Sequence, residues 1–169
     1  MGKQKGYVNG SDLLLFIEVA PASGTDPAVE KAIGHCTSHT ATFNTETKDV
    51  AVKPVSSEAQ GNTSLYKNKR VSGLSAQVKC DGLHFYGETE GGLKILMGKW
   101  AAGEPVKLKL YERKTTTSQD APEPYCQGMF IISSLENNAP AGEDATYTAT
   151  FDNDGAVDID TDNLDHDTE

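Results

Sequence analysis

The stretch FIISSLENNAPAGEDATYTATFDNDG, residues 130–155, decides the fold class of this chain. The segments 125–135 and 145–151 are rich in aromatic and β-branched residues, and the proline-containing segment between them is typical of a turn. We therefore predict two strands joined by a hairpin, with an abrupt change to an acidic tail after them. The stretch contains no nucleophile beside a base, no metal-ligand spacing and no phosphate-binding loop. It therefore indicates a structural role.

Composition supports a single β-rich domain. The chain has 169 residues, of which 37% are apolar, and Thr, Ser, Gly and Val recur along it. The net charge of -10 is concentrated at the C-terminal end, because eight acidic residues and no Lys or Arg lie from Asp152 to Glu169. Residues 1–151 then hold 17 acidic against 15 basic residues. This nearly neutral body lacks the basic surplus that nucleic-acid binding requires.

The cysteines and apolar runs restrict the environment. Cys36, Cys80 and Cys126 form neither a CxxC pair nor an even disulfide framework. We expect reduced, mostly buried thiols in a protein that folds in a reducing cytoplasm. The longest apolar run near the start, Leu13–Ile17, is too short for a signal peptide or a membrane span. No membrane partner is expected.

Alternation and turn residues predict most of the secondary structure. Clean alternation over 105–113 places Val106, Leu108 and Leu110 inward and Lys107, Lys109 and Tyr111 outward. Asp81-Gly82 predicts a turn before Leu83–Tyr86. The remaining strands are predicted over 12–20, 33–47, 71–80, 125–135 and 145–151, with loops over 21–32, 56–64 and 114–124.

One helix is predicted over about 89–102. Thr89 would cap it and Gly103 would end it. Its apolar stripe comprises Leu93, Ile95, Leu96, Met97 and Trp100. The predicted fold is therefore mainly β, an antiparallel β-sandwich or barrel with one flanking helix. We divide the chain into a flexible N-terminal arm (1–11), a single β-sandwich domain (12–155) and an acidic, disordered C-terminal tail (156–169).

The acidic tail offers one alternative binding site. Asp158, Asp160, Asp162 and Glu169 fall at positions 1, 3, 5 and 12 of an EF-hand-like calcium loop, but position 6 is Asn163 where the turn requires Gly. A calcium-dependent β-sandwich binding module therefore stays open as an alternative to a solvated tail. Otherwise no metal and no cofactor are expected.

Other candidate sites lack the required spacing. His35 and His39 would share a strand face about 13 Å apart, too far for one metal ion without a bend. Ser38-His39 and Asp81 supply the residue types of a hydrolase without a nucleophile elbow around them. A hydrolase with a triad assembled from loops is the last alternative, and no catalytic residue is assigned.

Several segments together resemble the major tail tube proteins of long, non-contractile-tailed bacteriophages and their prophages. They cover most of residues 10–155 in the order that such proteins show. The segments are Gly10–Glu18 (GSDLLLFIE), His39–Pro54 (HTATFNTETKDVAVKP), Asp81–Glu88 (DGLHFYGE), Ala101–Arg113 (AAGEPVKLKLYER) and residues 130–155. The acidic tail and the loop Thr115–Pro124 depart from the family pattern.

The resemblance implies a structural virion protein of the phage tail. It implies hexameric rings stacked into a tube, with strands from each subunit closing an inner β-barrel around a lumen. Implied partners are further copies of the chain, a tape-measure protein, a tail terminator, tail-tip proteins, and DNA that passes through without specific binding. Assembly would take place in the bacterial host cytoplasm. A tube protein of a contractile tail or secretion system is the related alternative.

The resemblance also suggests where rings meet. The arm 1–11 and the loops 21–32 and 46–64 are candidates for ring-to-ring contacts that become ordered on assembly.

Overall fold

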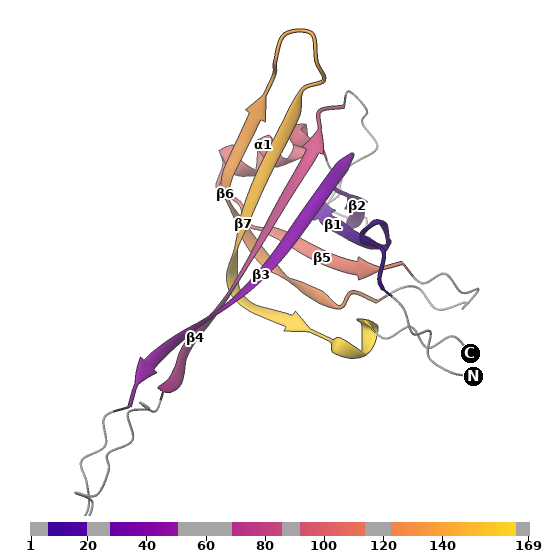
Figure 1. Ribbon diagram of the computed structural model, residues 1–169. Helices are drawn as coiled ribbons and strands as arrows, with labels where there is room; N and C mark the ends of the chain where they lie inside the picture. The colour runs from indigo at the N-terminus through magenta and orange to yellow at the C-terminus, as the bar shows by residue number, and fades with distance from the viewer. Residues whose placement is uncertain (1–6, 20–27, 51–68, 86–91, 114–122, 165–169) are drawn as a thin grey trace, which may run out of the picture.

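The computed structural model describes residues 7–19, 28–50, 69–85, 92–113 and 123–164. These residues form seven strands, one α-helix and two short 3-10 helices (Figure 1). In chain order they are η1 (Gly10–Asp12), β1 (Leu13–Val19), β2 (Val29–Ala32), β3 (Cys36–Asp49), β4 (Lys69–Leu83), α1 (Leu93–Ala102), β5 (Val106–Glu112), β6 (Cys126–Asn138), β7 (Thr146–Ile159) and η3 (Thr161–Leu164).

The strands form one antiparallel sheet in the order β2-β1-β5-β6-β7-β4-β3. The sheet bends over, so that β6, β7, β4 and β3 form one layer and β2, β1 and β5 lie behind it, with α1 beside β6 (Figure 1). Alternating side chains from both layers form one buried cluster, for example Ile17 and Leu108 from the rear layer and Val78 and Phe151 from the front layer. The predicted β-sandwich with one flanking helix is confirmed.

The bend depends on β7, which belongs to both layers. Its first part pairs with β4 as far as Asp152, and its last part pairs with the start of β6, with Val157 opposite Gly128. Where the pairing of β7 with β4 ends, the Asn153 side chain makes the next hydrogen bonds. Its Oδ1 accepts the Ala76 N–H at 2.9 Å, and its Nδ2 donates to the Gly155 carbonyl at 2.7 Å. Gly155 has φ of +90°, a value that favours glycine.

The predicted end of the last strand at Phe151 is wrong. β7 continues to Ile159 and η3 follows it, so residues 156–164 are not part of a separate tail. The strand was hidden because Asp152, Asp154 and Asp158 are exposed, while Val157 packs against the core. Residues 165–169 lie outside the described residues.

The predicted turn at Asp81-Gly82 is also wrong, because β4 runs through both residues to Leu83. Gly82 lies opposite Tyr147 on β7, and a Cβ at Gly82 would come within 2.7 Å of the Tyr147 ring. The glycine therefore makes room for an aromatic ring. It does not reverse the chain.

Two further predictions need correction in the rear layer. Val29–Ala32, predicted as part of a loop, forms β2 and pairs with β1. Tyr111, predicted to point outward, is buried, and its hydroxyl donates to Glu30 Oε2 at 2.8 Å. Tyr111 is thus covered by Glu30 on β2 and by the Phe16 ring on β1, and the local pattern of β5 could not show these contacts.

The helix begins later than predicted. Gly92, not Thr89, is its N-cap residue, and Thr89 itself lies outside the described residues. The predicted end at Gly103 is confirmed: this residue has φ of +65°, and its N–H donates to the Trp100 carbonyl at 3.0 Å.

Candidate assembly surface

The front layer has two open strand edges. β3 is the last strand of the sheet order, with β4 as its neighbour. On the opposite side, β5 pairs only with Cys126–Phe130 of β6, so within the described residues the other half of β6, 131–138, pairs with β7 alone. Because β6, β7, β4 and β3 alternate in direction, the two edge strands run antiparallel to each other. Such edges are templates for pairing with another chain.

The face of this layer that points away from the core is mostly polar, with the exposed apolar Leu83 and Ile131 among its residues. Register pairs continue across it: Thr40 lies opposite Lys79, Lys79 opposite Thr150, and Thr150 opposite Ser134. The residues between them on each strand face the core, because successive strand residues point to opposite sides. The other members of this face include Ser38, Thr42, Asn44, Ser75, Gln77, Asp81, Glu136, Asn138, Thr146, Thr148 and Asp152.

Hydrogen bonds join three strands on this polar face. Asp81 on β4 accepts from Ser38 on β3 at 3.1 Å and from Thr148 on β7 at 2.6 Å. The Thr148 hydroxyl is the largest cause that lowers the pKa of Asp81, and Ser38 and Lys79 lower it further. Gln77 donates to Asp152 at 2.8 Å. Asp81 is therefore ionised at neutral pH and ties the β3 edge to the centre of the sheet.

The polar face carries charges of both signs. Glu46, Asp81, Glu136 and Asp152 on it are acidic and Lys79 is basic. Lys48, two positions after Glu46 on β3, is also basic and lies opposite Arg70 at the end of the β3–β4 pair. Toward the centre of the layer, around Lys79, the carboxylates of Asp81, Glu136 and Asp152 predominate, and the strand register was needed to find them there.

The rear layer is held by an ion-pair network. Lys109 on β5 contacts Glu18 on β1 at 3.2 Å and also pairs with Glu30 on β2, which accepts from Tyr111. The hydrogen bond with Glu30 is the largest cause that raises the pKa of Lys109. Burial together with Glu30 raises the pKa of Tyr111 to about 12. This network fixes the short β2 onto the sheet.

The candidate hydrolase residues do not converge. Ser38 donates to Asp81 on the polar face, whereas His39 follows it on β3 and its side chain is half-buried on the opposite side. His35 lies in a turn before β3 with φ of +52°, and its ring contacts Phe85 at a centroid distance of 4.4 Å. The geometry therefore separates Ser38 from His39 and gives the Ser38 hydroxyl the Asp81 carboxylate as its partner.

The cysteines are free thiols in the described chain, and Cys80 and Cys126 are buried. Cys36 is half-buried beside Cys80 and donates to the Ser38 carbonyl at 3.1 Å. Contact with Cys80, together with His39, lowers the pKa of the Cys36 thiol. The same contact and burial raise the pKa of Cys80.

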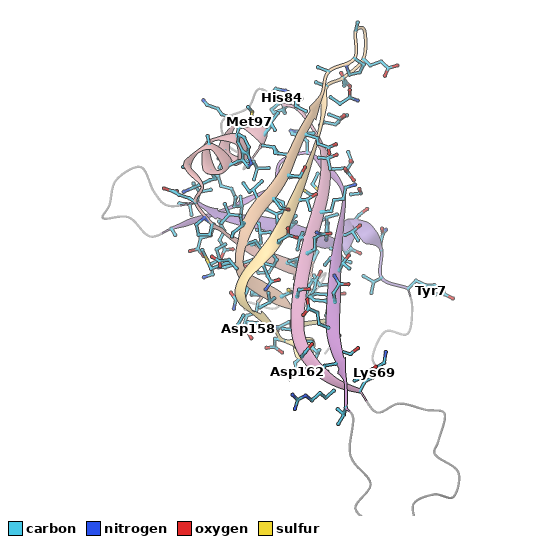
Figure 2. The ribbon with its side chains drawn as sticks, turned by 90° about the vertical axis from the view of Figure 1, so that its left-hand side faces the viewer. Tyr7, Lys69, His84, Met97, Asp158 and Asp162 are labelled. Carbon is cyan, nitrogen blue, oxygen red and sulfur yellow. The ribbon has the colours of Figure 1, made fainter. Side chains whose placement is uncertain are left out.

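The residues of the EF-hand-like pattern lie on different elements. Asp158 is on β7 and accepts from Gln127 at 3.3 Å, while Asp160 accepts the Asp162 N–H at 3.0 Å. Asp158 and Asp162 are marked in Figure 2. Glu169 lies outside the described residues. Within the described ranges, no group of three or more His, Cys, Asp and Glu residues could hold a metal ion.

No helix in the described part of the chain is long and apolar enough to cross a membrane.

Similarity to solved structures agrees with this geometry. The tail of an empty gene transfer agent particle with C6 symmetry matches 91% of this chain and 99% of its own, with a TM-score of 0.64 and 18% identity. The SPP1 tail tube matches 94% of this chain and 83% of its own, with a TM-score of 0.60 and 12% identity. The anti-feeding prophage cap covers 93% of this chain and 94% of its own, with a TM-score of 0.51 and 13% identity. The contractile-type alternative is therefore not favoured.

A comparison with curated protein sequences gave no match. The family model described as phage tail tube protein matches residues 7–158, which include every strand described above except the final residue of β7. The open edges, the bent sheet and this match agree with one another, and the chain belongs to the phage tail tube protein family.

Proposed function

We propose that this tail tube protein assembles six to a ring and that the rings stack into the tube of a phage tail. The observation that carries the proposal is the pair of open edges on β3 and on residues 131–138 of β6. Pairing β3 of one copy with β6 of the next continues the antiparallel alternation without a break. Such a head-to-tail contact closes into a ring when the rotation between copies is a simple fraction of a turn. The C6 symmetry of the gene transfer agent tail supports six copies.

The size of the resulting barrel fits a DNA conduit. Six copies of the four-stranded layer supply 24 strands. With strands about 4.8 Å apart and tilted by about 40°, the backbone diameter would be about 48 Å. Side chains on the inner face would reduce this by about 10 Å. The remaining opening is wider than a DNA duplex.

The polar face would line this opening, because the core and the rear layer occupy the other side of the sheet. Hydroxyl and amide groups there are weak partners for phosphates, and the carboxylates of Asp81, Glu136 and Asp152 near the centre of the face repel them. DNA would therefore pass without specific binding. The basic Lys79 near the centre of the face has the Asp81 carboxylate two residues further along the same strand.

We propose the remaining partners and location from the family. A tape-measure protein would occupy the lumen before DNA release, and a tail terminator and tail-tip proteins would bind the two ends of the tube. Assembly would take place in the bacterial host cytoplasm. The role is structural, without catalysis, and the separation of Ser38 from His39 supports this reading.

Proline scanning of the β3 edge tests the ring. In an edge strand, successive N–H groups point alternately to the neighbouring strand and to the open side. Proline has no N–H, so of Thr40→Pro and Ala41→Pro one removes a bond to β4 and the other removes only an N–H that points to the open side. The variant that keeps its bonds to β4 should fold, as judged by circular dichroism, and should stay monomeric. Wild-type protein should form rings or tubes in negative-stain electron microscopy. Normal tubes from both folded proline variants would rule out β3 as a pairing edge.

A further inference from the structure

The apolar stripe of α1 extends beyond the core of its own subunit. Leu93 and Leu96 are 4% and 0% exposed, whereas Trp100 is 57% exposed and Met97 51% exposed. Residues three, four and seven positions apart share one helix face. Trp100 therefore lies on the stripe that Leu93 and Leu96 bury, one turn further along, where the described chain no longer covers it.

Exposure of this kind is typical of a contact surface. A tryptophan buries more apolar area than most side chains, and leaving it in water costs about 25 cal/mol for each Å² of apolar surface. α1 ends at Ala102 with Gly103 as its C-cap, so Trp100 lies in the last turn of the helix, at the exposed end of the apolar stripe. Figure 2 shows Met97 on α1, with that side of the molecule toward the viewer.

A cavity lies on the opposite side of the subunit. It has a volume of about 680 Å³ and opens between η1 with the start of β1 and the start of β3. Leu13 and Leu14 supply apolar surface, while Asn9, Ser38 and His39 supply polar groups. An indole ring needs this combination, an apolar wall and an acceptor for its N–H.

The proposed ring brings these two surfaces together. The sheet order places β6 and α1 at one edge of the front layer and β3 with the cavity at the other (Figure 1). When β6 of one copy pairs with β3 of the next, the α1 that packs on β6 is carried toward the start of that β3. We propose that Trp100 and Met97 of each subunit dock into the cavity beside Cys36 of the neighbouring copy in the ring. This inference rests on the proposed ring assembly.

The chain carries its own probe for this contact, because Trp100 is its single tryptophan. Trp100 emission should shift to shorter wavelength and become protected from acrylamide when wild-type subunits assemble. Trp100→Ala should raise the protein concentration needed for assembly roughly 30-fold, as for an interface hot spot. Lys94→Ala, an exposed position off the stripe of the same helix, should leave it unchanged.

Cross-linking identifies the receiving surface. Assembled Met97→Cys protein treated with a short bismaleimide should give covalent dimers up to hexamers through the native Cys36, and adding Cys36→Ser should abolish them. Tubes in which Trp100 stays accessible to acrylamide, or Met97→Cys dimers that survive Cys36→Ser, would overturn the inference while leaving the ring intact. A failure of wild-type protein to form rings or tubes in electron micrographs would instead contradict the ring assembly itself.

Discussion

Gly82 and Tyr147 are register partners on β4 and β7, and the Tyr147 ring covers Gly82 so closely that a Cβ there would approach it within 2.7 Å. The Tyr147 hydroxyl donates to the Gly34 carbonyl at 2.9 Å, so the ring has no freedom to move aside. One close contact thus joins β4, β7 and the turn before β3.

We expect Gly82→Ala to lower the free energy of unfolding by about 1–3 kcal/mol, as overpacking of a filled core does. Urea denaturation of the monomer measures this. Gly98→Ala is the control, because Gly98 lies inside α1 with nothing within 4 Å of its Cβ position. It should stabilise by about 0.5–1 kcal/mol. Equal effects of the two substitutions would contradict the packing argument.

The bend of β7 should depend on the Asn153 side chain. Asn153→Ala leaves the N–H of the buried Ala76 without its acceptor, and we expect a loss of about 1–3 kcal/mol in the free energy of unfolding. Asn153→Asp keeps an acceptor for Ala76 and loses only the donor to Gly155, so its loss should be smaller. Thermal unfolding by circular dichroism ranks the two. The reverse order would mean that the contact with Gly155 dominates.

Acid should weaken the rear layer through Glu30. Burial raises the pKa of this carboxyl, but hydrogen bonds from Lys109 and Tyr111 lower it more. A carboxyl with a lowered folded-state pKa stabilises the fold above its unfolded pKa of 4.5, and this contribution is lost as pH falls through the folded value.

Glu30→Gln should therefore reduce the fall in stability between about pH 5 and about pH 3 by at most about 1 kcal/mol, since the pair is partly exposed. Urea midpoints across this pH range measure the slope. Glu143→Gln, at an exposed turn residue, serves as the control. If Glu30→Gln leaves the dependence of stability on pH unchanged, the ion-pair network of the rear layer does not contribute to the loss of stability in acid.

Reversing charges on the polar face should make the tube retain DNA. Glu136→Lys with Asp152→Lys places two new cations per subunit on the proposed lumen wall, where they can replace phosphate counterions. Tubes of this variant should retain duplex DNA at low salt and release it as salt rises, in gradient co-sedimentation. The same double change at the exposed Glu123 and Asp162, outside this face, should retain less. Equal retention would place the face outside the lumen.

The calcium alternative can be decided separately. Asp158 already accepts from Gln127, and Asp160 accepts the Asp162 N–H. We expect millimolar calcium to leave the melting temperature unchanged, because only ligand that binds the folded state raises it. A rise in wild type that Asp160→Asn with Asp162→Asn removes would restore the calcium-binding hypothesis.

Local patterns predicted the elements whose signals lie close together in the chain. Alternation in β5 predicted the buried Val106, Leu108 and Leu110, and Gly103 predicted the end of α1. The ordered family segments predicted the sandwich and the tail tube role. These features depend on neighbours within a few residues or on a resemblance of the whole chain.

The sequence alone thus determined a β-rich tail tube subunit with one helix and a polar, acidic end. Only the tertiary structure decided that Asp81-Gly82 continues a strand, that β7 crosses between layers at Asn153, and that Trp100 lies beyond its own core. Each of these depends on a partner far away in the chain. Gly82 lies opposite Tyr147, Asn153 accepts from Ala76, and the exposure of Trp100 depends on how α1 packs against β6. Long-range pairing leaves no periodicity in the local sequence, so the open edges and the polar face that we propose lines the lumen became visible only once the strand register was known.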